Sequence, residues 1–167
     1  GIVTDVCTKR KIRNYVELVK NENPENLSDE QKRYHIYVTE GAVLNRQHEK
    51  AYTYYGLDSK KETDVKENDE RLRKFMCNNF YDIRAFGAVM TTKVNCGQVR
   101  GPVQLNFARS IDPIVNQDIT VTRMAVTTED DAKKKVTEMG KKSIVPYGLY
   151  RQEGYISATL ANNEKKG

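Results

Sequence analysis

Apolar and polar residues alternate with a helical period through the first half of this chain. Apolar side chains recur three or four positions apart over about residues 4–20 and 42–55, which predicts two amphipathic helices. Gly56 follows the second helix at the position where glycine commonly ends one. Further along, Leu72, Phe75, Met76 and Phe80 have the spacing of a buried helical face, and the apolar run 82–90 predicts another short helix.

In most of the second half, apolar residues occur at every other position, which is the spacing typical of β-strands. Pro146 lies within one of these runs and indicates an edge or bulged strand there. The charged segment 129–142, between the strands predicted at 119–127 and 143–150, is expected to be a helix or a tip that ends at Gly140. A succession of helices followed by strands indicates an α+β fold. The predicted strands, including one isolated run in the first half, cover 34–38, 103–108, 119–127, 143–150 and 154–160.

A glycine-bracketed stretch, Gly97–Gly101, precedes the strand at 103–108 and has Arg100 inside it. Glycine lets backbone N–H groups face outward without a Cβ in the way, which suits a phosphate or another oxyanion. We therefore predict an anion-binding loop here. An ordinary glycine turn before a core strand is the alternative.

The net charge of +5 is unevenly distributed along the 167 residues. Residues 6–16 carry four basic side chains and no acid, and residues 83–111 carry four more and no acid. These two segments hold +8, which leaves −3 (5 minus 8) for the rest of the chain. Segregated positive charge is typical of proteins that bind polyanions, so nucleic acid is the favoured ligand.

The first predicted helix has its basic residues in a stripe beside the face expected to be buried. That face contains Ile12, Tyr15, Val16 and Val19. At about 100° per residue, Lys9, Arg13 and Lys20 fall in one stripe beside it, with Arg10 adjacent. Such a stripe offers cations to RNA or DNA, although a solvated helix face is the common meaning of the pattern.

Cysteine and histidine usage argues against a disulfide-bonded protein and against catalysis. The three cysteines are far apart and form no metal-type pair, which indicates a reducing, cytoplasmic setting. No apolar run reaches the length of a membrane span. Neither His35 nor His48 lies in a recognisable nucleophile arrangement, and no cofactor or metal motif is present. We therefore expect no enzyme activity and no cofactor.

Several stretches of the chain, in order, resemble one CRISPR protein family. Taken together they are similar to the backbone subunit of the type I-C Cascade complex, a member of the Cas-seven family. The resemblance rests on residues 3–7 (VTDVC), 9–13 (KRKIR), 82–90 (DIRAFGAVM), 97–104 (GQVRGPVQ), 107–114 (FARSIDPI), 122–127 (TRMAVT) and 145–151 (VPYGLYR).

The resemblance implies a modified RNA-recognition-motif (ferredoxin-like) palm with a fingers insertion and a thumb hairpin. One domain would cover 1–167, incomplete at both ends, with the fingers at 21–81 and the thumb at 115–145. It implies a non-catalytic CRISPR RNA-binding scaffold that stacks head to tail in multiple copies for antiviral defence. Its partners would be CRISPR RNA, target DNA by way of the guide, and other Cascade subunits, with no membrane.

The resemblance also implies an RNA-binding set. Residues of the first helix and the glycine stretch would contact phosphates, and residues of the thumb would contact the RNA, with Met124 as a wedge against a base. An alternative function within the same fold group is an endoribonuclease that processes CRISPR transcripts; its general base would be one of the two histidines or a tyrosine. The predicted RNA-binding residues are Lys9, Arg10, Arg13, Arg84, Gly97, Gln98, Arg100, Gly101, Thr122, Arg123, Met124, Lys141 and Lys142.

Overall fold

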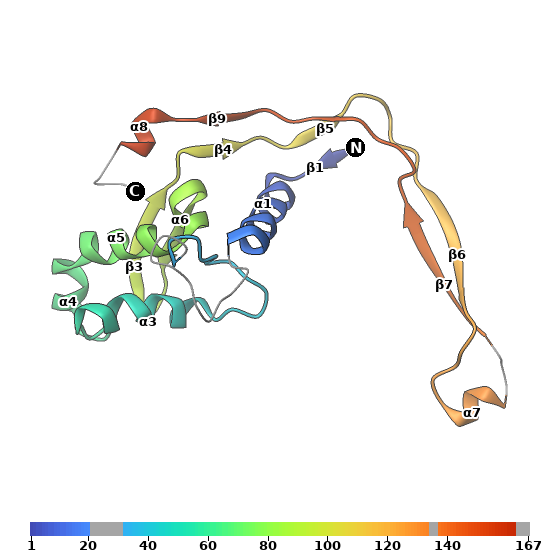
Figure 1. Ribbon diagram of the computed structural model, residues 1–167, viewed down its shortest axis with the longest axis horizontal. Helices are drawn as coiled ribbons and strands as arrows, with labels where there is room; N and C mark the ends of the chain where they lie inside the picture. Colours follow the sequence, from blue (N-terminus) through green and yellow to red (C-terminus); the bar gives the residue numbers. More distant parts are fainter. Residues whose placement is uncertain (21–31, 134–136, 163–167) are drawn as a thin grey trace. The chain divides into compact units, whose positions relative to one another are not determined.

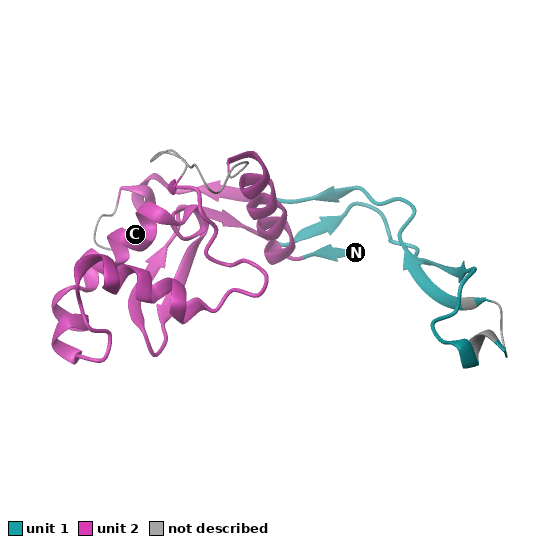
Figure 2. Ribbon diagram, turned by 60° about the horizontal axis from the view of Figure 1, so that its bottom comes forward, with its two compact units in different colours: residues 1–3, 107–152 teal, residues 4–106, 153–167 magenta. Residues whose placement is uncertain are grey.

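The computed structural model describes residues 1–20, 32–133 and 137–162 (Figure 1). The chain divides into two compact units (Figure 2). The larger unit comprises residues 4–106 and 153–167, and the smaller unit comprises residues 1–3 and 107–152. Each unit is described by itself.

The larger unit is a set of helices around an antiparallel hairpin. The hairpin joins β2 (Gly87–Thr91) to β3 (Asn95–Arg100), and a second antiparallel pair joins β4 (Val103–Leu105) to β9 (Gly154–Ile156). The described helices are α1 (Asp5–Lys20), α3 (Leu44–Tyr55), α4 (Glu62–Glu67), α5 (Asp69–Asn79), α6 (Tyr81–Phe86) and α8 (Ala158–Ala161).

The core of this unit forms where α5 and α3 pack on the β2–β3 hairpin. Leu72 and Met76 of α5 are fully buried together with Met90 and Cys96 of the hairpin. Gly97 lies against α5 with φ +76°, and a Cβ at this position would come within 2.6 Å of an Asp69 carboxylate oxygen. Glycine is therefore required here for close packing of the strand on the helix.

Asp82 joins three parts of the larger unit through one buried carboxylate. Its Oδ2 accepts hydrogen bonds from Arg13 Nε of α1 at 2.8 Å and from the Val38 N–H at 3.1 Å. Its Oδ1 accepts from the Tyr37 N–H at 2.8 Å. The side chain of Asp82 is 1% exposed, so this carboxylate has exchanged water for protein donors. It links α1 and the 37–38 segment to α6.

The smaller unit contains a three-stranded sheet and a long hairpin. The sheet has the order β1-β5-β8 and consists of β1 (Ile2–Val3), β5 (Ala108–Ser110) and β8 (Tyr150–Arg151). The hairpin pairs β6 (Gln117–Arg123) with β7 (Glu138–Ile144), from Gln117 opposite Ile144 to Arg123 opposite Glu138. A short helix, α7 (Glu129–Ala132), lies between the two strands in the sequence (Figure 1).

The structure confirms the α+β class and the main helices. The helices predicted over 4–20 and 42–55 are α1 and α3, and Gly56 ends α3 with φ +65°. Leu72, Met76 and Phe80 are buried as their spacing predicts. Residues 21–31, which belong to the predicted fingers insertion, lie outside the described part of the chain.

Three predicted elements are wrong. The helix expected over 82–90 ends at Phe86, because Gly87 takes φ +81° and the chain turns into β2. The strand expected over 34–38 is reduced to a bridge between His35 and Phe80, since the Tyr37 and Val38 N–H groups are bound to Asp82 instead of a neighbouring strand. The segment 129–142, expected to be a charged helix or a tip that ends at Gly140, contains the short helix α7, but the strand β7 begins at Glu138 and runs through Gly140.

The two C-terminal strand predictions are also corrected. Strand structure over 143–150 is limited to the end of β7 and the start of β8. Strand β9 covers only the beginning of 154–160, because the Ser157 side chain accepts a hydrogen bond from the Leu160 N–H and caps α8.

The orientation of α1 differs from the expected one. Tyr15 is 65% exposed and Val19 is 42% exposed, whereas Arg13 is buried. Because the Asp82 carboxylate pairs with Arg13, the helix turns that side inward. The predicted apolar face therefore contributes only Ile12 and Val16 as half-buried residues.

Replacement of Asp82 tests this account of the fold. In Asp82→Asn one carboxylate oxygen becomes an NH2 group, which cannot accept a hydrogen bond, and the negative charge that faces Arg13 is lost. We expect the free energy of unfolding in urea to fall by about 3–5 kcal/mol, the usual cost of breaking a buried ion pair.

The matched control is Glu62→Gln, which breaks an ion pair to Lys66 whose side chains are 80% and 74% exposed. Exposed pairs of this kind contribute little, so the control should unfold like the wild type. Equal losses in the two variants would contradict a special role for Asp82.

Candidate nucleic-acid interface

The basic residues of α1 are largely held by the protein itself. Lys9 Nζ is 2.8 Å from Asp5 Oδ2 and lies 5.7 Å from the centre of the Phe86 ring. The hydrogen bond from Lys9 lowers the pKa of Asp5. Arg10 Nη1 donates to the Val38 carbonyl at 2.7 Å. Lys9 and Arg10 are only partly exposed, so a ligand could contact only the solvent-facing atoms of these side chains.

Arg13 and Arg84 are structural in this fold. The Arg13 guanidinium is committed to Asp82 and lies 5.3 Å from the Phe86 ring centre. Arg84 donates to the Cys77 carbonyl at 2.7 Å and to the Arg33 carbonyl at 3.2 Å, and burial lowers its pKa. Cys77 is in the last turn of α5, so Arg84 binds a carbonyl that the helix leaves without an intrahelical partner.

The glycine stretch is a strand and not the anion-binding loop predicted from its sequence. Residues 97–100 lie in β3, where Gly87 pairs with Arg100 and Val89 with Gln98. A Cβ on Gly101 would come within 2.3 Å of the Gly87 nitrogen. The absence of a Cβ at Gly101 therefore lets its backbone approach that of Gly87 closely. The N–H groups of this stretch do not point together into an open loop that could hold an anion.

Gln98 and Arg100 are nevertheless exposed, on either side of the buried Val99. Within the described ranges, the Arg100 side chain forms no hydrogen bond and no ion pair. It borders a shallow hollow that also contains Phe86 and Gln104. The Gln104 amide nitrogen donates to the Gly101 carbonyl at 2.8 Å, which fixes this side chain on the rim.

The thumb residues predicted from the sequence lie in the β6–β7 hairpin or directly after β6. Lys141 is opposite Thr120 and Lys142 is opposite Ile119, so the two lysines project from opposite faces. Thr122 is exposed, and Met124 is 80% exposed.

Arg123, at the end of β6, is used by the following turn. Its Nε donates to the Ala125 carbonyl at 2.9 Å, and its Nη2 donates to the Thr127 hydroxyl at 3.0 Å. These contacts shape the chain where it leaves the strand. The hairpin thus has exposed lysine, threonine and methionine side chains, and Arg123 stabilises the turn that follows β6.

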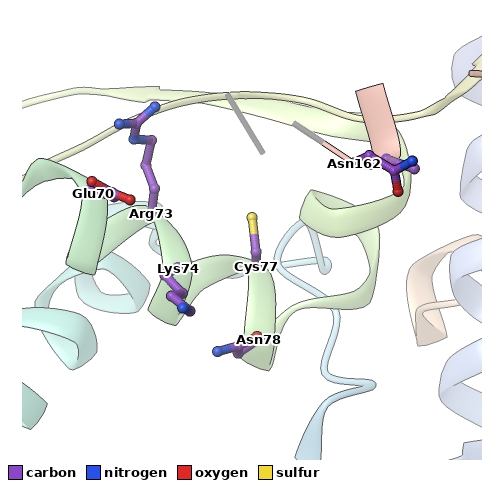
Figure 3. Close-up of a pocket in the computed structure, with 7 residues that line it drawn as sticks. Glu70, Arg73, Lys74, Cys77, Asn78 and Asn162 are labelled. Carbon is purple, nitrogen blue, oxygen red and sulfur yellow. The ribbon is translucent and has the colours of Figure 1, made fainter. Parts of the chain in front are cut away.

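A pocket on α5 was not predicted. The α5 residues that line the pocket lie on successive turns of the helix: Glu70, then Arg73 and Lys74, then Cys77 and Asn78. The Cys77 thiol points into the pocket (Figure 3). Burial raises the pKa of this thiol, and Arg73 is ion-paired with Asp69 at 3.0 Å. The spacing of these residues along α5 was visible in the sequence, but the mixed charge of the segment gave no reason to select them.

The two histidines differ in how deeply they are buried. His48 is fully buried: its Nδ1 is 2.7 Å from the Val94 carbonyl and its Nε2 is 2.7 Å from the Tyr37 hydroxyl. These contacts are satisfied when Nδ1–H donates to the carbonyl and Nε2 accepts from the tyrosine. His35 is half-buried. Within the described ranges, no group of three or more histidine, cysteine or acidic side chains gathers as metal ligands.

The comparison with known families identifies the chain. Its α+β fold carries exposed cations on β3 and on a long hairpin, as expected of a nucleic-acid-binding protein. The family model described as CRISPR-associated protein Cas7 matches residues 1–167, so the chain belongs to this family. None of the curated proteins matches it. No described helix combines the length and the apolar character needed to cross a membrane.

Stability should depend on pH because the protein interior shifts the pKa of both histidines. Burial lowers the pKa of both His35 and His48 below the ordinary value of 6.5. A lowered histidine pKa means that the unfolded chain binds the proton more readily. The resulting stability is complete above about pH 6.5 and is lost as the pH falls below it.

We therefore expect the free energy of unfolding, measured in urea at several pH values, to fall between pH 7 and pH 5. In His48→Asn the amide can still donate to the Val94 carbonyl but does not titrate, so the fall should be smaller. The same pH dependence in both proteins would exclude His48 as its source.

Proposed function

We propose that this chain is a non-catalytic, CRISPR RNA-binding backbone subunit of a type I-C Cascade complex that serves antiviral defence. Several copies would stack head to tail along one guide RNA, beside other Cascade subunits, and leave the guide free to pair with target DNA. The observation that carries the proposal is the family match over residues 1–167, since this family indicates a backbone subunit that binds CRISPR RNA in interference complexes.

The distribution of exposed charge supports binding to a nucleic-acid backbone. Arg100, Lys141 and Lys142 are exposed and have no ion-pair partner within the described ranges. Phosphate contacts by such cations give affinity without sequence preference, which suits a subunit that must hold guides of any sequence. Of the predicted contacts on α1, Lys9 and Arg10 remain in the proposal and Arg13 does not.

The state of the histidines and the buried tyrosines supports a non-catalytic role over RNA cleavage. A general base must be accessible and must lose its proton near neutral pH. His48 has both ring nitrogens occupied, and burial raises the pKa of Tyr37 and of Tyr52 to about 12. In the proposed role, an end-labelled CRISPR repeat RNA stays intact when incubated with the protein.

Binding of a labelled CRISPR RNA across a salt series tests the phosphate contacts. The variant Arg100→Gln/Lys141→Gln/Lys142→Gln removes three exposed charges. We expect weaker binding, and the slope of log affinity against log salt should become shallower by about 2, since each phosphate contact to a single strand contributes about 0.7.

The control is Lys60→Gln/Lys61→Gln, which removes exposed charge from the mixed-charge segment. Its affinity and slope should be nearly those of the wild type. If the two variants lose affinity equally, the binding is nonspecific attraction to a basic protein, and the assignment of the interface fails.

Assembly in multiple copies makes a separate prediction. Light scattering with RNAs of increasing length should show the mass of the complex rising in equal steps, one copy for each added segment of RNA. A single copy on every length of RNA would contradict the stacking proposal and leave simple RNA binding in place.

A further inference from the structure

Three aromatic side chains meet where the end of α3 lies beside α5. The Tyr54 ring centre is 5.0 Å from that of Tyr55 and 5.2 Å from that of Phe75. Tyr55 and Phe75 are half-buried, whereas Tyr54 is 71% exposed. Within the described ranges, the Tyr54 hydroxyl forms no hydrogen bond. Two partly buried rings therefore hold one aromatic ring at the surface, and we call these three side chains the aromatic platform.

Cations flank the aromatic platform on both helices. Lys50 is one turn before Tyr54 on α3, is exposed, and its side chain forms no hydrogen bond or ion pair within the described ranges. Arg71 of α5 is also exposed. Its Cζ lies 4.5 Å from the Tyr55 ring centre, and its Nη1 donates to Asn68 Oδ1 at 3.0 Å. Both of these contacts are to uncharged groups, so the positive charge of Arg71 is not neutralised.

The acidic residues of α3 and α5 lie on other sides of these helices. At about 100° per residue, Glu49 is about 140° from Tyr54 around α3. Around α5, Asp69 is about 120° and Glu70 about 140° from Phe75. The platform therefore combines an exposed aromatic surface with positive charge, which fits a polyanion that carries aromatic bases better than an apolar protein partner.

The aromatic platform lies on the side of α5 that is turned away from β3. Gly97 of β3 packs against α5 beside Asp69 and Arg73. Phe75 is two positions beyond Arg73, which places it about 160° around the helix from that contact. The platform is therefore separate from the part of β3 that carries the exposed Arg100.

We propose that the aromatic platform stacks the bases of a single-stranded DNA. Every base has a π-face, so tyrosine rings bind bases of any sequence, and the adjacent cations attract the phosphates between them. In the proposed function the bases of the guide must stay free to pair, so a surface that stacks bases suits another strand. When a guide pairs with one strand of a DNA duplex, the other strand is left single. The inference goes beyond the proposed function and rests on it only for the source of this strand.

An introduced tryptophan tests stacking directly, because the chain contains none. In Tyr54→Trp, titration with oligo(dT) should quench the indole emission to saturation, since a base stacked on the indole quenches it. An oligomer of equal length built from abasic sites has the same phosphates and should leave the emission unchanged. Equal quenching by the two oligomers would show that charge, and not stacking, brings the DNA there, and the proposal would be wrong.

The matched control is Thr53→Trp, which places the same indole at the neighbouring exposed position of α3. This position is about 100° away around the helix, so its emission should respond little to either oligomer. If Thr53→Trp and Tyr54→Trp are quenched equally, the contact is not specific to the platform, and the assignment of the site fails.

Removal of the ring should weaken binding without weakening the fold. In Tyr54→Ala we expect the affinity for labelled oligo(dT) to fall about tenfold, because stacking on the ring is lost. Tyr54→Phe keeps the ring and should bind like the wild type. Since Tyr54 is exposed, the thermal midpoint of Tyr54→Ala should stay close to that of the wild type. A loss in Tyr54→Phe as large as in Tyr54→Ala, or a lower midpoint together with weaker binding, would overturn the proposal.

The same tryptophan separates this site from the guide interface. When Tyr54→Trp is combined with Arg100→Gln/Lys141→Gln/Lys142→Gln, oligo(dT) should still quench the indole while binding of CRISPR RNA is weakened. If CRISPR RNA quenches Tyr54→Trp as strongly as DNA of the same sequence, the platform holds the guide, and the DNA assignment is overturned. If no DNA quenches the indole while RNA binding is intact, the platform fails and the proposed function stands. If DNA quenches the indole but the wild type does not bind CRISPR RNA, the proposed function fails and the platform stands.

Discussion

The buried pair between Arg13 and Asp82 determines how the larger unit presents its basic residues. A carboxylate inside a protein is tolerated only when donors replace its water, and Asp82 obtains them from α1 and from the 37–38 backbone. This requirement fixes the rotation of α1. Arg13 faces inward, and Tyr15 faces solvent although its spacing suggested burial.

The same requirement divides the cations of the two acid-free segments into two groups. Arg13 and Arg84 stabilise the fold through a carboxylate and through backbone carbonyls, while Arg100 and Arg109 have no such partner within the described ranges. A count of basic residues therefore overstates the surface that is available to a polyanion. Only the cations that have no partner within the fold are available to a polyanion.

The sequence was sufficient for elements whose signals are local. Helices α1, α3 and α5 follow from apolar spacing, and the end of α3 follows from Gly56. The sequence was insufficient where packing against a distant segment determines the local structure. The glycines at 97 and 101 indicated an open loop, but they serve close packing against α5 and Gly87, which only the tertiary structure shows.

The candidate site was predictable to the same degree. Gln98 and Arg100 on β3 and the chosen residues of the hairpin are exposed, whereas Gly97 is half-buried and Gly101 is buried. Arg13 pairs with Asp82, 69 positions away, and Arg84 donates to the Arg33 carbonyl, 51 positions away. No periodicity in the sequence encodes those distances.

The smaller unit has little core of its own. Ala108 is the one buried side chain among those of this unit whose exposure is described, and every residue of β6 is exposed. A two-stranded hairpin without a packed face is marginally stable in water. The apolar residues Ile119 and Val121 share one face with Lys142, and the opposite face carries Thr120 and Lys141. If the chain assembles on a guide RNA as proposed, we expect both faces to gain their packing from the RNA and from neighbouring copies, so that assembly and ordering of the hairpin occur together.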